Sequence, residues 1–224
     1  MRVTGVIQAG GRSTRMGGEP KALITVGGRR IIERVISVVA PAVDDLLVVT
    51  NTPDLYAFLR IPMVPDAFPD HGSLGGIYSG LQAASGEAAF TVACDMPFVS
   101  PAVVRAVVAC AGQADVVIPR AGGQLQALHA LYAKACLPRI EERLRAGRLK
   151  ITGFFEYVSV FEIPEEELGR LDDPIRSFMN VNTPEELGHA RALAEIRGDQ
   201  GELRPTLPRA GAPRLGPEIG PSSR

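Results

Sequence analysis

The most informative part of the chain is residues 3–21, which read VTGVIQAGGRSTRMGGEPK. The segment opens with a short apolar run and continues into the glycine pair Gly10 and Gly11. An apolar run bounded by glycines is typical of a central parallel strand, because both faces of such a strand are covered. The glycine pair then predicts a turn at the carboxyl end of this strand. Open α/β sheets bind their ligands at that edge, so the segment predicts a binding site there.

Positive charge is concentrated around this turn. The first 34 residues carry seven Lys or Arg against two Glu, among them Arg12, Arg15 and Lys21, whereas the whole chain has a net charge of −1. Successive N–H groups of a glycine turn can also point at one anion. Both features favour a site for a small polyanion over a nucleic-acid surface. Glycine-rich turns are common, however, and the dinucleotide and P-loop fingerprints are absent, so the glycines alone leave the phosphate site open.

Length and composition predict one globular domain. The chain has 224 residues, 46% hydrophobic and 22% charged, and we place a single domain at residues 1–197. Residues 198–224 hold five prolines and five glycines and are predicted to be a disordered tail. Neither a membrane span of about 20 apolar residues nor a signal peptide is recognisable, so we expect a cytoplasmic protein without membrane or nucleic-acid partners. Three widely spaced cysteines favour neither disulfides nor a zinc site.

Strand and helix patterns alternate along the domain. This alternation predicts an α/β protein with a mostly parallel sheet covered by helices on both sides, a three-layer α/β/α arrangement. Ser73 and Ser100 are predicted to cap helices, and the acidic residues 162–173 to form a solvated loop. Beyond the first strand, the predicted strands are residues 46–49, 61–64, 88–93, 115–119, 124–132 and 158–161; the predicted helices are residues 31–39, 73–84 and 137–146, with two more starting near Ser100 and Thr183.

Several residues stand where a ligand would lie. Asp95 directly follows the strand at 88–93, where its carboxylate can hold Mg²⁺ against phosphate oxygens or close an ordinary turn. Asn51 follows the strand at 46–49 and is most simply a turn residue. Gly75 and Gly76 weaken a predicted helix, so close approach by a ligand or another strand is needed to explain them. His129 either reaches a substrate or is a hydrogen-bonded structural histidine.

The end of the domain carries a second group of polar residues. Thr183 and Glu186 have the spacing of a capping box that starts the last helix. Capping does not account for Asn180 and Asn182, which are two residues apart and therefore on the same side of an extended chain. These two amides are thus further candidates for substrate contact.

Four motifs, in this order, resemble those of a known family. Residues 8–17 with Lys21 behind them resemble the nucleotidyltransferase signature L-A-G-G-x-S-x-R-M-G-x-x-K, with Gln8 in place of leucine. Residues 66–77 resemble the D-x-x-P-x-x-G-P-L-A-G-I motif of molybdenum cofactor guanylyltransferases, with Ser73 and Gly75 replacing proline and alanine. Residues 94–97 are similar to that family's magnesium motif, and residues 178–187 to its F-x-N-x-N-T-P-E-[ED]-L motif. The resemblance covers residues 3–197.

The resemblance implies a nucleotidyltransferase (Rossmann-like) fold with a nucleotide-binding N-terminal half and a pterin-binding C-terminal half. It implies transfer of GMP from GTP to the terminal phosphate of molybdenum–molybdopterin, with Mg²⁺, giving the guanine dinucleotide cofactor and pyrophosphate. Implied protein partners deliver or receive the cofactor, and we expect a monomer or weak oligomer. The implied residues are Arg15, Lys21 and Asp95 for catalysis; Gln8, Ala9, Gly10, Gly11, Lys21, Asn51, Asp66 and Asp95 for the nucleotide; Asp95 for the metal; and Asn180 and Asn182 for the pterin.

Three alternatives stay open. A cytidylyltransferase acting on the same pterin would need only a different base pocket, although residues 74–77 are more similar to the guanine branch. A cytidylyltransferase of isoprenoid synthesis, acting on another small phosphate, shares the glycine turn but not the ending at residues 178–187. A non-catalytic nucleotide-binding partner protein is the third, and the presence of both Lys21 and Asp95 speaks against it.

Overall fold

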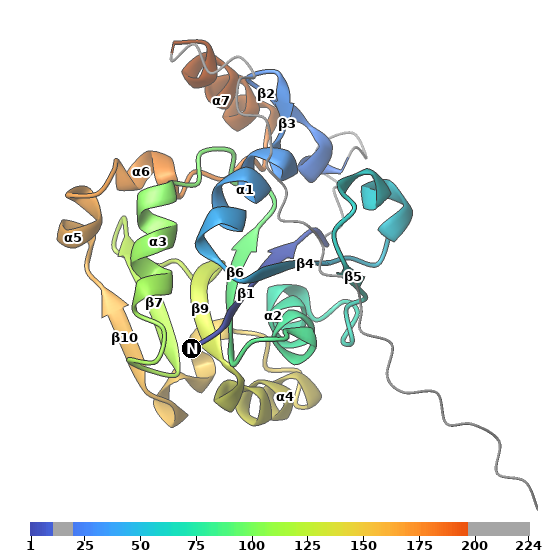
Figure 1. Ribbon diagram of the computed structural model, residues 1–224, viewed down its shortest axis with the longest axis vertical. Helices are drawn as coiled ribbons and strands as arrows, with labels where there is room; N and C mark the ends of the chain where they lie inside the picture. The colour runs from blue at the N-terminus through green and yellow to red at the C-terminus, as the bar shows by residue number, and fades with distance from the viewer. Residues whose placement is uncertain (11–19, 197–224) are drawn as a thin grey trace, which may run out of the picture.

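An eight-stranded sheet forms the centre of the protein. The structure is a computed structural model that describes residues 1–10 and 20–196 (Figure 1). The strand order is β10-β7-β9-β6-β1-β4-β5, with β8 paired to β7. The strands of this sheet are β1 (Val3–Gln8), β4 (Asp45–Val49), β5 (Met63–Val64), β6 (Ala88–Ala93), β7 (Val116–Ala121), β8 (Gln124–Leu125), β9 (His129–Ala133) and β10 (Val160–Ile163).

The sheet is mainly parallel around its central strand. β1 pairs in parallel with β4 and with β6, and β4 pairs in parallel with β5 at the edge. Two strands run the other way: β9 is antiparallel to both β6 and β7, and the short β8 is antiparallel to β7. The predicted mostly parallel sheet is therefore confirmed, with β6 beside the central β1 and the short β5 at the edge.

Helices cover both faces of the sheet (Figure 1). Ile7 and Phe90 pack on one side with α1 (Ile31–Val39) and α3 (Pro101–Ala109). Val6 and Ala89 point to the other side, toward α2 (Gly72–Ala83) and α4 (Leu137–Arg145). Neighbouring residues of one strand thus enter two separate cores, which confirms the predicted three-layer α/β/α arrangement. Within the part of the chain that the structure describes, no helix is both long and apolar enough to cross a membrane.

The remaining elements lie around this frame. At the top of Figure 1, α7 (Pro184–Ile196) stands beside the hairpin of β2 (Thr25–Val26) and β3 (Arg29–Arg30), beyond the carboxyl end of β6. The short helices are α5 (Glu165–Gly169) and α6 (Pro174–Ser177), and the 3-10 segments are η1 (Lys21–Leu23), η2 (Ala40–Ala42), η3 (Pro53–Leu59), η4 (Lys134–Cys136) and η5 (Ile151–Tyr157).

Neither of the two serines predicted to cap helices, Ser73 and Ser100, makes a side-chain capping hydrogen bond. α2 begins at Gly72 with His71 as its N-cap, because the positive φ angles of Asp70 and Gly72 turn the chain before Ser73 is reached. Ser100 does hold the N-cap position of α3, but its side chain makes no capping bond. Its hydroxyl is buried and has no hydrogen-bond partner among the described residues.

Several predicted segments differ in extent; the strand predicted at residues 61–64, for example, is observed only at Met63–Val64. The predicted strand at residues 124–132 is broken into β8 and β9, because the chain turns where the His129 N–H donates to the Gln126 carbonyl (2.9 Å). This turn lets β9 leave β8 and pair with β6. The acidic residues 162–173 are not all loop, since α5 forms within them with three glutamates in its first turn, where they complement the helix dipole, and with Leu168 buried beneath.

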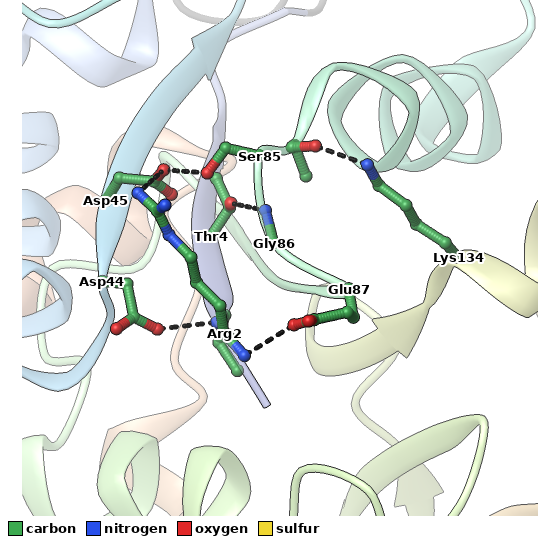
Figure 2. Close-up of polar contacts among 10 residues, drawn as sticks. Arg2, Thr4, Asp44, Asp45, Ser85, Gly86, Glu87 and Lys134 are labelled. Atoms are coloured by element: carbon green, nitrogen blue, oxygen red, sulfur yellow. Dashed lines mark hydrogen bonds and ion pairs between the residues drawn. The ribbon is translucent and has the colours of Figure 1, made fainter.

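Polar contacts fix the start of β1 at the amino edge of the sheet (Figure 2). The Arg2 backbone N–H donates to the Glu87 carboxylate (2.7 Å), and the Arg2 guanidinium pairs with Asp45 (3.1 Å). The Gly86 N–H donates to the Thr4 hydroxyl (3.1 Å). These contacts join the start of β1 to the segments before β4 and β6, at the edge opposite the strands' carboxyl ends.

Gly86→Ala is expected to lower the free energy of unfolding by about 2 kcal/mol, as overpacking does. A Cβ at residue 86 would lie 2.3 Å from the Arg2 carbonyl oxygen, a backbone atom that cannot rotate away. The control is Gly188→Ala in α7, where the Cβ meets nothing within 4 Å and a gain of about 0.5–1 kcal/mol is expected. Urea denaturation of both variants measures the difference, and equal effects would contradict it.

Candidate functional site

A cleft of about 650 Å³ opens at the carboxyl ends of β1 and β4. It lies where the sequence predicts a ligand site. Its walls come from the end of β1, the segment after β4 with η3, the loop after β5 and the start of α2. The lining residues are Gln8, Ala9, Gly10, Pro20, Val49, Thr50, Asn51, Thr52, Leu55, Tyr56, Asp66, Pro69, Asp70, Gly72, Ser73 and Gly76.

Five predicted nucleotide residues, Gln8, Ala9, Gly10, Asn51 and Asp66, therefore share this cleft. The other predicted residues of the glycine turn, Gly11 and Arg15, lie outside the described residues. So do Arg12 and the predicted tail at 198–224.

Backbone bonds hold the end of β1 between its neighbours. The Ala9 N–H donates to the Val49 carbonyl (2.9 Å), and the Cys94 N–H donates to the Gln8 carbonyl (3.2 Å). The N–H of Ala9 is thus already used, which corrects the expectation that it would bind phosphate. Gly10 is the first residue beyond these bonds; it is exposed, and a Cβ added to it would meet nothing within 4 Å. A ligand can therefore approach the backbone at Gly10.

The glycines of α2 let this helix pack closely against the cleft floor. A Cβ on Gly75 would lie 2.9 Å from the Phe68 carbonyl oxygen and 3.0 Å from the Asp66 carboxylate. A Cβ on Gly76 would lie 2.6 Å from Oε1 of Gln8. The predicted close approach is confirmed, and the approaching atoms belong to β1 and to the loop after β5.

Asp66 and Asn51 organise the same wall of the cleft. Oδ1 of Asp66 accepts hydrogen bonds from the Ser79 hydroxyl (2.9 Å) and the Phe68 N–H (3.0 Å). Oδ1 of Asn51 accepts from the Asp66 N–H (2.9 Å). Ser79 was not predicted as a site residue; its only sequence signal is a polar residue on the apolar side of α2, where it is buried. Both candidate side chains thus shape the loop that lines the cleft.

Lys21, Asp95 and Asn182 meet beside the cleft, on the β6 side. Nζ of Lys21 donates to Oδ1 of Asn182 (2.6 Å), across 161 residues of sequence. The Val181 N–H donates to the Asp95 carbonyl (2.9 Å), which holds the segment before α7 against the end of β6. Three of the predicted residues from distant parts of the chain are therefore brought together.

The Asp95 carboxylate is poorly solvated. Burial raises the pKa of this carboxyl, and the positive charge of Lys21 partly opposes that rise. Its Oδ1 is buried without a hydrogen-bond partner among the described residues. An ionised carboxylate with an unused oxygen favours a cation as its missing partner.

Asp95 is the predicted metal ligand at this point of the structure. The described residues contain no cluster of three or more His, Cys, Asp or Glu side chains that could hold an ion by themselves. Mg²⁺ in phosphate-transfer sites is commonly held by one or two carboxylates, with water and substrate phosphates completing its shell. Asp95 fits such a site, in which water and substrate phosphates complete the coordination shell, and not a site built from protein ligands alone.

The two candidate pterin residues have different surroundings. Asn182 contacts Lys21, and its backbone N–H donates to the Glu186 carboxylate (2.6 Å). Asn180 is exposed, and its side-chain amide donates to the Phe178 carbonyl (3.3 Å). Glu186 also accepts from the Thr183 N–H (3.0 Å), and the Glu186 N–H donates to the Thr183 hydroxyl (3.2 Å), which confirms the predicted capping box.

His129 matches neither of the predicted roles. It is completely buried in β9, with its ring edge-to-face with Phe90 and Phe178. Neither ring nitrogen has a hydrogen-bond partner in the described part of the chain. Desolvation lowers the pKa of His129 to about 3, so the ring is a neutral part of the core.

Replacing His129 by leucine is expected to reduce the loss of stability that the protein shows as the pH falls below about 6.5. The folded chain keeps His129 neutral, whereas the unfolded chain protonates it below its ordinary pKa of about 6.5, so stability falls as the pH drops from there toward 3. His129→Leu removes this contribution, and thermal midpoints at pH 7, 6 and 5 measure it. His189→Leu, on an exposed face of α7, is the matched control and should keep the wild-type slope. Parallel slopes for all three proteins would contradict the assignment.

Comparison with known proteins places these features in a family. The family model of the MobA-like NTP transferase domain matches residues 5–156. The probable molybdenum cofactor guanylyltransferase of Pelotomaculum thermopropionicum is 40% identical over 195 residues, 87% of this chain and 95% of that protein. The molybdenum cofactor guanylyltransferase of Desulfosudis oleivorans is 40% identical over 191 residues, 85% of this chain and 95% of that protein.

A solved structure agrees with these matches. The molybdopterin-guanine dinucleotide biosynthesis protein A of Archaeoglobus fulgidus superposes with a TM-score of 0.76 and 26% identity, over 86% of this chain and 99% of that chain. The likeness extends through β10 and α7, beyond residues 5–156, since the relatives cover more of the chain than the domain match does. The chain therefore belongs to the family of MobA-like NTP transferases that includes these guanylyltransferases.

Proposed function

We propose that this protein transfers GMP from GTP to the terminal phosphate of molybdenum–molybdopterin, releasing pyrophosphate. The observation that carries the proposal is the meeting of Lys21, Asp95 and Asn182 beside the cleft at the carboxyl end of β1. Relatives 40% identical over most of their length are named for this guanylyl transfer. A cation, a partly desolvated carboxylate and an open backbone turn together suit a polyphosphate substrate.

The nucleotide occupies the cleft in this proposal. The triphosphate lies against the turn that starts at Gly10, which is exposed at the cleft. Asn51 and Asp66 face the other part of the nucleotide from the opposite wall. Gly11 and Arg15, from the same turn, add a further N–H and a positive charge.

The chemistry requires alignment and countercharge from the protein. An oxygen of the molybdopterin phosphate attacks the α-phosphorus of GTP, the bond from that phosphorus to the bridging oxygen breaks, and pyrophosphate leaves with the electron pair. No covalent enzyme nucleophile is needed. Lys21 neutralises charge that develops on the phosphates, and Asp95 holds Mg²⁺, which when bound stabilises negative charge on phosphate oxygens.

The pterin lies on the far side of Lys21 in this proposal. Asn182 faces it through the same side chain that fixes Lys21, and Asn180 borders it from the surface. The domain at residues 1–197 then has a nucleotide-binding N-terminal half and a pterin-binding C-terminal half. Proteins that deliver molybdopterin or receive the finished cofactor are the partners that such a product requires.

Pyrophosphate release tests the proposal directly. Purified protein with Mg²⁺ and molybdopterin is given GTP, CTP or ATP in parallel, and release is expected with GTP. Release with CTP alone would keep the mechanism and move the substrate to the cytidine class. Binding of GTP without release of pyrophosphate from any nucleotide would overturn the catalytic function.

A further inference from the structure

Tyr56 is a buried cleft residue that the proposed function does not use. It lies in η3, after β4, and its side chain is 3% exposed. Its ring belongs to the core that α1 covers, and the residue also forms part of the cleft lining. A side chain with both properties has its ring in the core and one end at the cleft.

The end at the cleft is the hydroxyl. In the described part of the chain this hydroxyl has no hydrogen-bond partner. It is also absent from the set of buried polar atoms that lack a partner, so it is accessible to solvent. The other buried tyrosines differ, since Tyr132 donates to the Ala127 carbonyl (2.8 Å) and the Tyr78 hydroxyl accepts from Gln82 (3.4 Å). A buried ring with an accessible, unpartnered hydroxyl offers a donor to whatever fills the cleft.

Tyr56 lies near the predicted phosphate end of the site. It lines the same cleft as Gly10, the residue at which the glycine turn begins. Tyr56 follows β4 and Cys94 follows β6, and both belong to the packing of the core that α1 covers. The carboxyl end of β1, which leads to Gly10, lies between those two strands. A donor at this place in the cleft can reach a phosphate held at the glycine turn.

The hydroxyl keeps its proton at any working pH. Burial raises the pKa of Tyr56 to about 12, with the nearby Cys94 thiol adding to the effect. A neutral phenol beside an anionic ligand acts as a hydrogen-bond donor.

We propose that Tyr56 is a positioning residue whose hydroxyl donates a hydrogen bond to a phosphate oxygen of the bound nucleotide. The proposal rests on the proposed function in one respect, that the ligand of the cleft is a nucleoside triphosphate. The rigid ring holds the donor in place because the core packs around it. A donor fixed in this way orients the triphosphate relative to Lys21 and Asp95 before the reaction begins.

The test compares Tyr56→Phe with Tyr78→Phe in the full chain. Each variant loses one hydroxyl and keeps its ring, but the Tyr78 hydroxyl is bonded within the protein, away from the cleft lining. Dissociation constants for GTP come from calorimetry and those for guanosine from NMR titration, with thermal midpoints to verify folding. A hydrogen bond to a charged group corresponds to about a tenfold change in affinity or more.

We expect Tyr56→Phe to bind GTP about tenfold more weakly, to bind guanosine as the wild type does, and to raise KM for GTP without a matching rise in KM for molybdopterin. Tyr78→Phe should match the wild type in both ligands. Unchanged GTP affinity in Tyr56→Phe, or an equal loss for guanosine, would overturn the proposal.

Failure of this proposal is distinguishable from failure of the proposed function. If wild type and Tyr56→Phe bind GTP equally well and both release pyrophosphate, the role of Tyr56 falls and guanylyl transfer stands. If the wild type prefers CTP, the same comparison with CTP and cytidine decides the role of Tyr56, while guanylyl transfer falls.

Discussion

Replacing Lys21 by alanine is expected to lower the rate of pyrophosphate release by about a thousandfold with the fold intact. The Lys21 amine donates to Asn182, which comes from the other end of the domain, and its charge reaches Asp95. It therefore connects a residue of the proposed pterin side with the predicted metal ligand. Single-turnover release of pyrophosphate at saturating GTP measures the loss, and a thermal midpoint close to that of the wild type shows that folding is unaffected.

Two further variants separate charge from packing. Lys21→Arg keeps a positive charge and should retain more activity than the alanine variant, although its wider head group cannot reproduce the 2.6 Å contact with Asn182. Lys134→Ala removes a lysine whose amine donates to the Ala84 carbonyl at the opposite edge of the sheet (Figure 2). That variant should be less stable but turn over normally. A Lys21→Ala protein with a near wild-type rate would exclude Lys21 from catalysis.

Local sequence patterns predicted most of the sheet and its covering helices. The apolar runs at β1, β4 and β6 are continuous because those strands are buried on both faces, so they are distinct even in a single sequence. The helix at residues 31–39 could be predicted because its buried residues recur at helical spacing. Such signals depend on each element's own burial and need no knowledge of its neighbours.

What the sequence did not predict depends on contacts between distant residues. The break between β8 and β9 follows from the pairing of β9 with β6, and the use of the Ala9 N–H follows from the register of β1 against β4. Neither depends on the local residues alone. His129 was considered as a substrate contact or a hydrogen-bonded structural histidine, yet two aromatic rings enclose it.

The edge of the sheet that carries the site could be predicted from local sequence patterns, whereas the contact between Lys21 and Asn182 could not. Gly10 and Asp95 each follow a strong strand signal, so the shared edge of the sheet follows from topology. The contact between Lys21 and Asn182 spans 161 residues and was not predicted; the motif resemblance only assigned each residue to the site. Tyr56 was missed because an aromatic residue between apolar neighbours is typical of a core position, and only the structure shows that it lines a cleft.

Asp95→Asn is expected to abolish most activity and to raise stability at neutral pH. The amide keeps the shape of the side chain but removes the charge that would hold Mg²⁺, and pyrophosphate release should fall at least about a hundredfold. The folded chain retains the Asp95 proton more tightly than the unfolded chain, because burial raises its pKa. Ionised Asp95 therefore lowers stability at neutral pH, and asparagine removes that cost.

Because Asp95→Asn is expected to raise stability, its loss of activity can be distinguished from a loss caused by unfolding. The stability advantage of Asp95→Asn should be largest near pH 7 and should shrink as the pH falls toward 4, because the wild-type carboxyl then takes up its proton. His129 acts in the opposite direction over the same range, so the comparison is made between proteins that both retain His129. Glu195→Gln, the same carboxylate-to-amide change on the exposed surface of α7, should shift the thermal midpoint little at any pH. A variant both inactive and less stable than the wild type at pH 7 would mean that the Asp95 carboxylate supports the fold, and its assignment to the metal would lose its physical basis.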